Sequence, residues 1–332
     1  MSAPAARTVF LTGATGFIGA RLARRLAERG DTLRCLVRPT SDTSELRRLG
    51  ARLVPGDVND VDAMAAGMAG ADLAYHLAAI YDIGVVDEGA LERVNVGGTR
   101  DFLAALRRAG VPRAVYVSTT LALGPVEEGE GDEHSTHDER WVSAYERTKV
   151  EAHRLARAAQ RGGLPLGIAC PAYVYGPGDD GPGGRFLRDL RRRRVPALPY
   201  RTNWYSFVHV DDVADGLLRL GEAGRPGESW VLSGEHRDFR EFARAAARLM
   251  GVGLSPVRLP TALVRATGAA LDVVSRATGV RFPVTREGAD VAGGGRRYLH
   301  SHAKATRELG WTPRPLAEGL GETVAVLEVE DR

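Results

Sequence analysis

The stretch TGATGFIG, residues 12–19, decides the fold of this chain. It ends an apolar, strand-like run, VFLTG (9–13), and opens a helix-like run, GARLARRLAERG (19–30). Gly13, Gly16 and Gly19 therefore stand at a strand-to-helix turn, which is the setting of a dinucleotide-binding fingerprint. Such glycines permit a tight turn, close approach of the backbone to a pyrophosphate, and close packing of helix on strand. The pyrophosphate is then held by free N–H groups at the helix N-terminus.

The rest of the first half repeats this alternation of strand and helix. Apolar runs about 20 to 45 residues apart, with amphipathic stretches between them, are typical of a parallel sheet covered on both faces. We therefore predict an α/β fold, a Rossmann-type doubly wound parallel sheet with a smaller, mostly helical substrate-binding lobe. The sheet domain is expected to span 1–170, with 205–234 returning to it, and the lobe 171–204 and 235–332. The predicted strands are 9–13, 33–37, 52–56, 73–79, 114–119 and 166–170, followed by a strand and helix over 206–220.

Composition excludes several classes of protein. The 332 residues are 44% hydrophobic and 26% charged, and a net charge of +3 is spread along the chain, so nucleic acid is not an expected partner. Cys35 and Cys170 each end an apolar run and have no metal-ligand spacing, which favours reduced core thiols. The N-terminus shows no signal-peptide pattern and no run has membrane-spanning length, so we expect a cytoplasmic protein without stable membrane insertion.

The segment SAYERTKVEA (143–152) contains one of only two lysines, Lys149 and Lys304, among 45 lysines and arginines. Tyr145 and Lys149 are four residues apart, so they share one face of a helix. A phenol titrates near pH 10 in water and is a weak acid–base catalyst at neutral pH. A nearby cation lowers the pKa of the phenol, and lysine supplies a compact charge that can also release its proton.

The spacing Gly-x-x-Gly-x-x-Gly together with Tyr-x-x-x-Lys resembles the extended branch of the short-chain dehydrogenase/reductase family. This branch contains NAD(P)-dependent epimerases, dehydratases and reductases. Further similar segments follow in order over essentially the whole chain. They are GDV (56–58), HLAA (76–79), VNVGGT (94–99), PAYVYGPGD (171–179), FVHVDDVA (207–214) and ELGWTPR (308–314).

The resemblance implies a catalytic set of Thr119, Tyr145 and Lys149. Ser118, Thr119 and Thr120 all follow the fifth strand, and Thr119 is selected because it stands five residues before Gly124. Thr120 is the alternative. The implied cofactor-binding residues are Gly13, Thr15, Gly16, Phe17, Ile18, Gly19, Arg38, Asp57, Val58, Leu77, Ala78, Ala79, Asn95, Tyr145, Lys149, Pro171 and Val174.

The end of the second strand favours NADP(H) over NAD(H). An acidic residue there would bind the ribose hydroxyls and repel a 2′-phosphate, but this strand ends LVRPTSD (36–42), with Arg38 in that place. A guanidinium can bind a phosphate through two hydrogen bonds. The alternative is that Arg38 is simply one of 43 arginines.

The resemblance also narrows the reaction. Dehydratases of this branch follow the catalytic threonine with Asp-Glu, whereas here Thr120 and Leu121 follow. Nucleotide-sugar enzymes carry an asparagine and an arginine where this chain has Tyr173 and Tyr205, which weakens the case for a sugar diphosphate. The expected substrate residues are Tyr81, Thr120, Tyr173 and Tyr205; the alternative for the tyrosines is packing between the lobes.

These features predict an NADP-dependent reductase of a ketone or aldehyde, similar to dihydroflavonol-reductase-like and 3β-hydroxysteroid-dehydrogenase-like members. The alternatives are a sugar or nucleotide-sugar epimerase and a non-catalytic NADP-binding sensor. The expected partner is a small carbonyl or alcohol substrate, and a homodimer is compatible with the resemblance.

Three other segments carry weaker signals. HSTHDE (134–139) places two histidines among carboxylates, but it is interpreted as a mobile polar loop and no metal is expected. The run 259–280 is interpreted as a helix packed within the lobe, with a membrane-surface helix as the alternative. Arg191–Arg194 is interpreted as a solvated face, and no role is predicted for Lys304.

Overall fold

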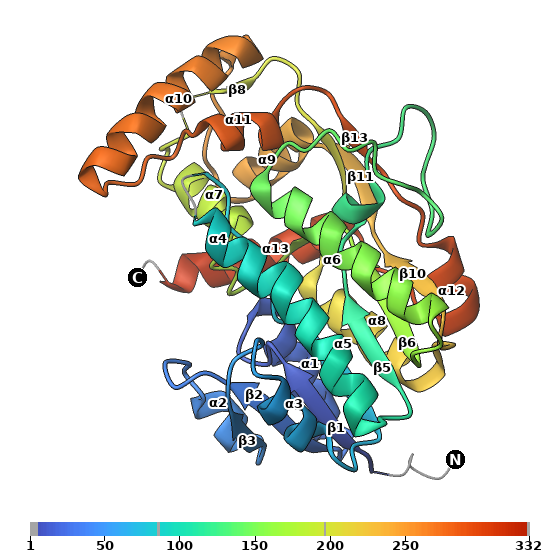
Figure 1. Ribbon diagram of the computed structural model, residues 1–332. Coiled ribbons are helices and arrows are strands. Elements are labelled where there is room, and N and C mark those ends of the chain that lie inside the picture. The colour runs from blue at the N-terminus through green and yellow to red at the C-terminus, as the bar shows by residue number, and fades with distance from the viewer. Residues whose placement is uncertain (1–5, 85–86, 196, 331–332) are drawn as a thin grey trace.

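A computed structural model describes residues 6–84, 87–195 and 197–330; the outermost residues of the predicted domains, 1–5 and 331–332, lie outside these ranges. A seven-stranded parallel sheet, ordered β10-β6-β5-β4-β1-β2-β3, forms the centre of the fold (Figure 1). The doubly wound α/β fold is therefore confirmed. Its strands are β1 (Thr8–Thr12), β2 (Thr32–Val37), β3 (Arg52–Pro55), β4 (Leu73–His76), β5 (Ala114–Val117), β6 (Leu166–Pro171) and β10 (Ser229–Leu232).

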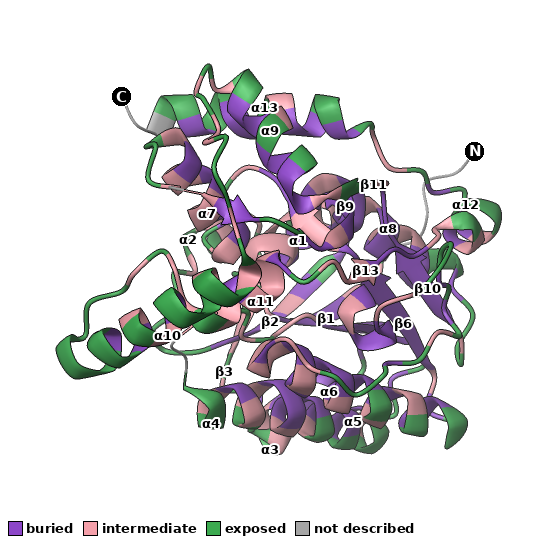
Figure 2. Ribbon diagram, turned by 90° about the horizontal axis from the view of Figure 1, so that it is seen from above, coloured by how far each residue is buried: buried purple, intermediate pink, exposed green. Residues whose placement is uncertain are grey.

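Helices cover both faces of this sheet, as the apolar strands require. One core cluster joins the sheet to α1 (Phe17–Glu28), α8 (Val210–Ala223) and α12 (Ala303–Leu309). A second core cluster joins the other face of the sheet to α3 (Val61–Met68), α5 (Gly98–Ala109) and α6 (Ala144–Arg161). Figure 2 shows the buried strands between these two helical layers. Shorter elements connect them: α2 (Ser44–Arg48), α4 (Glu88–Leu91), a π-helical stretch η1 (Glu92–Gly97) and a 3₁₀ turn η2 (Thr120–Leu123).

The strand order reverses between β1 and β4, and this position fixes where a ligand can bind. Thr12 at the end of β1 is in register with Leu36 of β2 and with His76 of β4. The segments that follow these strands therefore meet at one edge of the sheet. In open α/β sheets the crevice at such a switch point is the usual ligand site.

A second, smaller sheet lies beyond this edge, and it corrects one prediction. The strand predicted to return to the main sheet is β9 (Trp204–His209), which instead pairs with β7 (Tyr173–Tyr175), β11 (Glu235–Asp238) and β13 (Arg297–Tyr298). The seventh position of the main sheet belongs to β10, which pairs with β6. An apolar strand buried on both faces carries no local signal of which sheet it joins, whereas α8 does return to the main sheet as predicted.

The small sheet packs against helices to form a third core cluster, rich in aromatic residues. These helices are α7 (Pro182–Arg191), α9 (Phe239–Leu249) and α13 (Leu316–Glu330), and a short pair, β8 (Leu198–Pro199) with β12 (Arg258–Leu259), lies nearby. The last two helices, α10 (Thr261–Thr278) and α11 (Arg286–Ala292), form an arm that projects from the upper left of Figure 1. The division into two domains stays a prediction.

Several side chains confirm or extend the sequence interpretation. Cys35 and Cys170 are free and buried, and burial raises the pKa of each thiol to about 12. Lys304 links α12 to β10, because its ammonium donates to the carbonyl of Ser229 and pairs with Glu228 at 2.8 Å. Arg191 donates to the carbonyl of Leu327, while 192–194 are exposed. Across the described ranges, no helix combines the length and apolarity needed to cross a bilayer.

Candidate active site

The glycine turn after β1 forms the floor of the site. Gly13 has a φ of +72°, and a Cβ there would lie 2.6 Å from the amide nitrogen of Ala78. A Cβ on Gly19 would lie 2.0 Å from the carbonyl oxygen of Gly13, so only glycine lets α1 start this close to the turn. The amide of Gly16 donates to the Gly13 carbonyl at 3.0 Å.

The N-terminus of α1 is open to an anion. Gly16 is its N-cap and provides no side-chain cap, so a ligand can accept from the first-turn N–H groups. Thr15 and Gly16 are exposed, and Phe17 and Ile18 are half-buried. This cradle fits the pyrophosphate of a dinucleotide.

The segment after β4 lies directly over the glycine turn. The amide of Ala78 donates to the hydroxyl of Thr12 at 3.3 Å, and the same hydroxyl lies 2.8 Å from Nδ1 of His76. Leu77 and Ala78 are half-buried and Ala79 is exposed, so the structure brings these predicted residues to the edge of the cradle.

The predicted adenosine side is at the ends of β2 and β3. Arg38 follows β2 and is exposed, and its carbonyl accepts from Ser41 in a turn. Asp57 follows β3, is exposed, and accepts from the amide of Asn59. Val58 is buried against Gly98, where a Cβ would meet it at 2.7 Å. Both Arg38 and Asp57 are therefore free to reach a nucleotide.

Asn95 connects the segment after β4 to α6. It is buried, its carbonyl oxygen accepts from the amide of Ile80 at 2.8 Å, and its amide donates to the Ile80 carbonyl and to the Thr148 hydroxyl, both at 3.1 Å. These bonds use both amide protons and the oxygen. Asn95 therefore positions the segment after β4 against α6, and its contact with a cofactor stays a prediction.

Helix α6 carries Tyr145 and Lys149. Its first turn is fixed by Ser143, whose hydroxyl accepts from the amide of Glu146 at 3.0 Å. Lys149, one turn deeper, is 5% exposed, and its ammonium donates to the carbonyl of Val117 at the end of β5. Thr119 follows two residues later, and its hydroxyl accepts from the amide of Leu121 at 3.3 Å. Lys149 and Thr119 thus meet at the carboxyl end of β5.

The pKa of Tyr145 does not show the lowering by Lys149 that the sequence predicts. Burial raises the pKa of Tyr145, and no lowering by Lys149 is seen. Burial lowers the pKa of Lys149 to about 8, because the charged form loses water. The reason is geometric, since the ammonium is directed to the Val117 carbonyl and lies 5.2 Å from the Tyr116 ring centroid. The phenol is therefore neutral at pH 7, the form that can donate a proton.

Aromatic residues and glycines surround Tyr145. The rings of Tyr81 and Tyr145 are 4.7 Å apart. A Cβ on Gly181 would meet the Tyr81 ring at 3.3 Å, and one on Gly183 would meet the Tyr173 hydroxyl at 3.0 Å. The loop 176–185 therefore lies against both tyrosines. Pro171 and Val174, which lead into it from β6, are buried and half-buried.

Tyr205 and Thr120, which the sequence predicts to contact the substrate, are both buried. Tyr205 is 4% exposed, stacks on Tyr298 with ring centroids 5.4 Å apart, and donates its hydroxyl to the Val291 carbonyl at 2.7 Å. This is the packing alternative. Thr120 is also buried, as the first residue of η2. Among the predicted substrate residues, Tyr81 has its ring next to that of Tyr145, and Tyr173 lies against the same 176–185 loop as Tyr81.

Two carboxylates that support the start of α6 were not predicted. Glu287 of α11 accepts from the amides of Ala144 and Gly84, at 2.6 and 2.5 Å, so it joins α6 to the Tyr81 segment. Glu146 is fully buried and accepts from Tyr298, from the Val142 amide, and from Nε2 of His137. Glu287 lies 143 positions from Ala144 in sequence, so no local pattern could reveal it.

His137 corrects the interpretation of 134–139 as a mobile loop. Its side chain is buried, stacks on Trp141 at 4.6 Å between ring centroids, and bonds to Glu146 at 3.0 Å. The amide of Glu139 donates to the other ring nitrogen. Both nitrogens therefore already have partners, and the segment is packed onto the start of α6.

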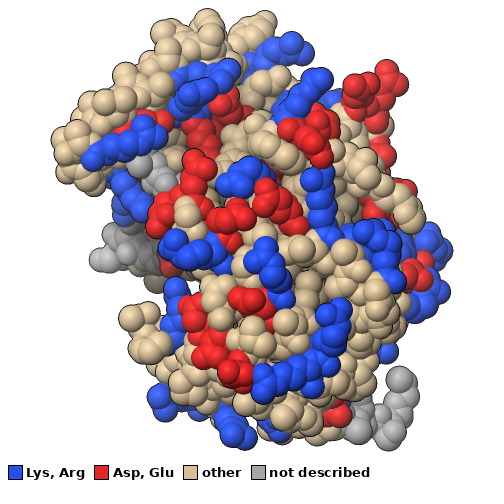
Figure 3. All heavy atoms as spheres, in the orientation of Figure 1, with Lys and Arg blue, Asp and Glu red and all other residues tan. Residues whose placement is uncertain are grey.

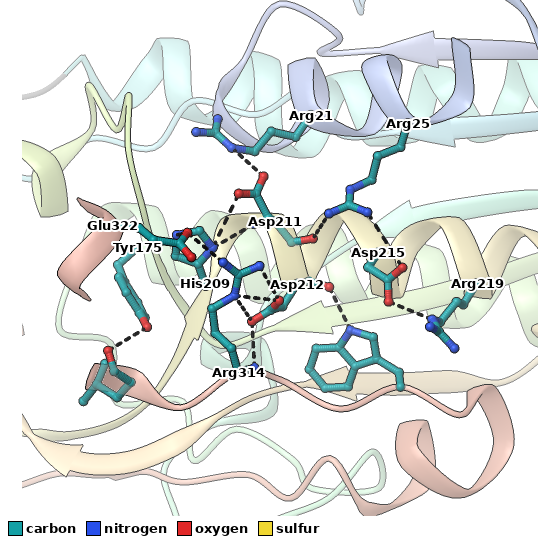
Figure 4. A network of polar contacts seen from close by, with 12 residues as sticks. Arg21, Arg25, Tyr175, His209, Asp211, Asp212, Asp215, Arg219, Arg314 and Glu322 are labelled. Atoms are coloured by element: carbon teal, nitrogen blue, oxygen red, sulfur yellow. Dashed lines mark hydrogen bonds and ion pairs between the residues drawn. The ribbon is translucent and has the colours of Figure 1, made fainter. Parts of the chain in front are cut away.

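Behind the cofactor cradle, a network of ion pairs connects three parts of the chain (Figure 4). Arg21 of α1 pairs with Asp211 of α8 at 3.1 Å, and Arg314 pairs with Asp212 at 3.0 Å. Arg314 also pairs with Glu322 of α13 at 2.7 Å. His209, Asp211 and Glu322 place ligand-type atoms within 4.8 Å of one another. Because the two arginines already pair with these carboxylates, the group does not favour a divalent cation.

Comparison with known proteins agrees with this geometry. Residues 9–233 match the model of the NAD dependent epimerase/dehydratase family. The chain is 33% identical to sterol demethylase protein B of Methylococcus capsulatus over 273 residues, covering 81% of this chain and 82% of that protein. It is 29% identical to the 4-hydroxy-2-methyl-3-oxo-4-farnesyl-3,4-dihydroquinoline-1-oxide ketoreductase of Stigmatella aurantiaca, covering 92% of each. The solved structure of gox2253 has a TM-score of 0.83 and 34% identity, covering 98% of this chain and 99% of that one.

Proposed function

The chain belongs to the NAD-dependent epimerase/dehydratase family and is an enzyme of the extended short-chain dehydrogenase/reductase type, and from this premise we propose that it reduces a ketone or aldehyde with NADPH. The observation that carries the proposal is the surroundings of Tyr145. The phenol of Tyr145 is half-buried and protonated at neutral pH, and its ring centroid lies 4.7 Å from that of Tyr81. Lys149 follows one turn later on α6, and its ammonium donates to the Val117 carbonyl, two residues before Thr119.

The roles of the residues follow from their positions. Thr119 and Tyr145 donate hydrogen bonds to the substrate carbonyl and so polarise it. NADPH, when bound in the cradle, would supply the hydride that the carbonyl carbon accepts. Tyr145 then gives its proton to the developing alkoxide, for which a neutral phenol is the required form. Lys149 binds the nicotinamide ribose and, with a pKa of about 8, can return a proton to the phenol.

NADP preference rests on Arg38. It is exposed at the end of β2, beside the turn that holds the pyrophosphate, where an acidic residue would have disfavoured a 2′-phosphate. Its guanidinium can form two hydrogen bonds to that phosphate. We therefore place NADP(H) above NAD(H).

The substrate is proposed to be lipophilic. Tyr173 packs among aromatic rings, with centroids 4.9 Å from Phe207 and 5.5 Å from Tyr205. At the two positions where nucleotide-sugar enzymes are expected to bind the diphosphate, this chain has Tyr173 and Tyr205, and neither carries a positive charge. Two relatives are named for a sterol and for a farnesylated quinoline oxide. These names support a ketone on a large apolar skeleton.

A second candidate, epimerisation of a sugar nucleotide, is favoured by the family description and by the likeness to a solved nucleoside-diphosphate-sugar epimerase. It requires the same hydride transfer, followed by return of the hydride to the opposite face. The dehydratase reaction is not proposed, because Thr120 and Leu121 stand in the place of the acid and base that elimination needs.

The purified protein should oxidise NADPH in the presence of cyclic and steroid-like ketones, measured as loss of absorbance of the reduced cofactor. Exchange at C4 of a nucleotide sugar without net cofactor turnover would refute the reductase. Tyr145→Phe should keep NADPH binding and lose at least about a hundredfold in turnover, as expected for removal of a general acid. Tyr200→Phe is the matched control, since Tyr200 is 64% exposed and lines a different hollow, beside Arg201 and Arg240.

A further inference from the structure

Helix α10 exposes apolar side chains and buries polar ones, which is the opposite of an ordinary surface helix. Its exposed apolar side chains include Leu263, Val273 and Val274, which are 52%, 63% and 44% exposed. Its buried residues are Gly268, Asp272 and Ser275. An ordinary surface helix buries its apolar stripe and exposes its polar residues.

The exposed face is continuous and uncharged. With 3.6 residues per turn, the nine exposed uncharged residues cover an arc of about 160°. They are Ala262, Leu263, Ala266, Thr267, Ala270, Val273, Val274, Ala277 and Thr278. Val257 before the helix and Val280 after it, 51% and 52% exposed, extend this face at both ends. We call this set of eleven residues the α10 face.

The polar side attaches α10 to the rest of the protein. A Cβ on Gly268 would lie 2.4 Å from the carbonyl carbon of Thr285, so α10 crosses the 285–286 backbone closely. The carboxylate of Asp272 accepts from the amide of Arg286 at 3.1 Å. These contacts fix the rotation of the helix and leave its apolar side chains directed outward.

Charge distinguishes the partners that could cover this face. Residues 253–286 contain five arginines and one acidic residue, and that residue, Asp272, is buried. All five arginines are exposed: Arg258, Arg265, Arg276, Arg281 and Arg286. Two of them pair with part-buried acids of neighbouring elements, Arg265 with Asp290 at 2.9 Å and Arg281 with Asp82 at 3.5 Å. The projecting arm in Figure 3 accordingly shows uncharged surface with arginines beside it.

We propose that the α10 face docks the enzyme onto an anionic lipid surface. An apolar helical face edged by arginines is the arrangement that lies in a membrane interface, with its side chains among the acyl chains and its cations at the phosphates. A second copy of the chain is a poorer partner, because a two-fold contact through this face would bring the two sets of arginines together. The helix lies on the surface and does not cross it, in keeping with the charges of Arg265, Asp272 and Arg276 within its 18 residues.

The arm also lies next to the catalytic helix. Glu287 of α11, directly after the 285–286 crossing, bonds to the amides of Ala144 and Gly84, which neighbour Tyr145 and the Tyr81 segment. A docked α10 would therefore hold the active site near the lipid phase. The proposal goes beyond the reaction, and its test does not depend on activity.

Co-sedimentation of the NADPH-bound protein with vesicles tests the docking. Vesicles of phosphatidylcholine with about one quarter phosphatidylglycerol should bind the wild type, and phosphatidylcholine alone should bind it at least about tenfold more weakly. Binding should fall as salt is raised. The double variant Val273→Asp, Val274→Asp should lose at least about tenfold in partitioning, and Leu263→Ser, at the other end of the helix, should lose less.

The matched control is Val326→Asp, Val329→Asp on α13, where both residues are exposed (38% and 70%) outside the α10 face. This control should bind vesicles as the wild type does, and NADPH binding should be unchanged in every variant. Equal binding of the wild type and the α10 variants, or no binding of the wild type to anionic vesicles, would overturn the proposal. It would also be overturned if the α10 variants split a larger oligomer, measured by light scattering, while vesicle binding is absent throughout.

Discussion

Replacing Lys149 with methionine should stabilise the cofactor-free protein while abolishing turnover. The lysine is 5% exposed, and burial lowers its pKa from 10.5 to about 8. At one pKa unit per 1.4 kcal/mol, keeping this charge buried costs the folded state about 3 kcal/mol at neutral pH. Methionine has a similar length and no charge, so it removes this cost.

One contact offsets part of the gain. Lys149 donates to the carbonyl of Val117, and losing that hydrogen bond costs about 1 kcal/mol. The net increase in the free energy of unfolding is therefore about 2 kcal/mol. For 332 residues, with an unfolding entropy of about 2 cal/mol/K per residue, this raises the Tm by about 3 °C.

The extra stability of the Lys149→Met protein over the wild type should decrease as pH rises. Between pH 8 and pH 10.5 the unfolded wild type still holds the lysine proton, whereas the folded protein has released it. The wild type therefore gains stability relative to the variant as pH rises through this window. The difference between the two proteins should be largest below pH 8 and should vanish or change sign near pH 10.5.

Thermal unfolding followed by circular dichroism over this pH range measures the effect, and NADPH oxidation measures turnover. Lys304→Met is the matched control, because it replaces the only other lysine of the chain, whose ammonium pairs with Glu228. That change should lower stability slightly and leave turnover intact. A Lys149→Met protein that is less stable than the wild type at pH 7, or whose difference does not change with pH, would refute the burial argument.

Three further perturbations follow from the site. Gly19→Ala forces a Cβ to within 2.0 Å of the Gly13 carbonyl, so NADPH affinity measured by fluorescence should fall at least about tenfold; Gly253→Ala, with no atom within 4 Å of the added Cβ, should have no such effect. Arg38→Gln should raise KM for NADPH about tenfold and leave KM for NADH unchanged, whereas an equal change for both would contradict the phosphate contact. Asn95→Leu leaves the amide and carbonyl of Ile80 unpaired and should lower the free energy of unfolding by about 2 to 4 kcal/mol in urea titrations; an unchanged midpoint would show that water replaces the side chain.

Local sequence was sufficient to predict the parts of the fold that are made by neighbouring residues. The glycine turn is one such case, since its strand, turn and helix are consecutive and its spacing has a steric cause visible at Gly13 and Gly19. The placement of Tyr145 and Lys149 one turn apart on α6 is another, because helical spacing alone sets it.

Features that depend on distant parts of the chain could not be predicted in this way. The sequence does not show that β9 joins the small sheet, because its apolar residues satisfy either sheet. Nor does it show that Glu287 supports α6, or that the hydroxyl of Tyr205 is taken by Val291. Nor does the sequence show that the side chain of Asn95 bonds to Ile80 and Thr148, because both partners are far from it along the chain.

The ion-pair network behind the cofactor cradle has a consequence for the order in which the protein matures. Its partners come from α1, from the start of α8, and from the segment that leads into α13. The indole of Trp311 also donates to the carbonyl of Asp212 at 2.8 Å. A chain emerging from the ribosome makes the glycine turn first, but it receives Arg314 and Glu322 some 300 residues later. The ion pairs behind α1 are therefore completed only after Arg314 and Glu322 have been synthesised, so tight cofactor binding should appear only once this segment has emerged.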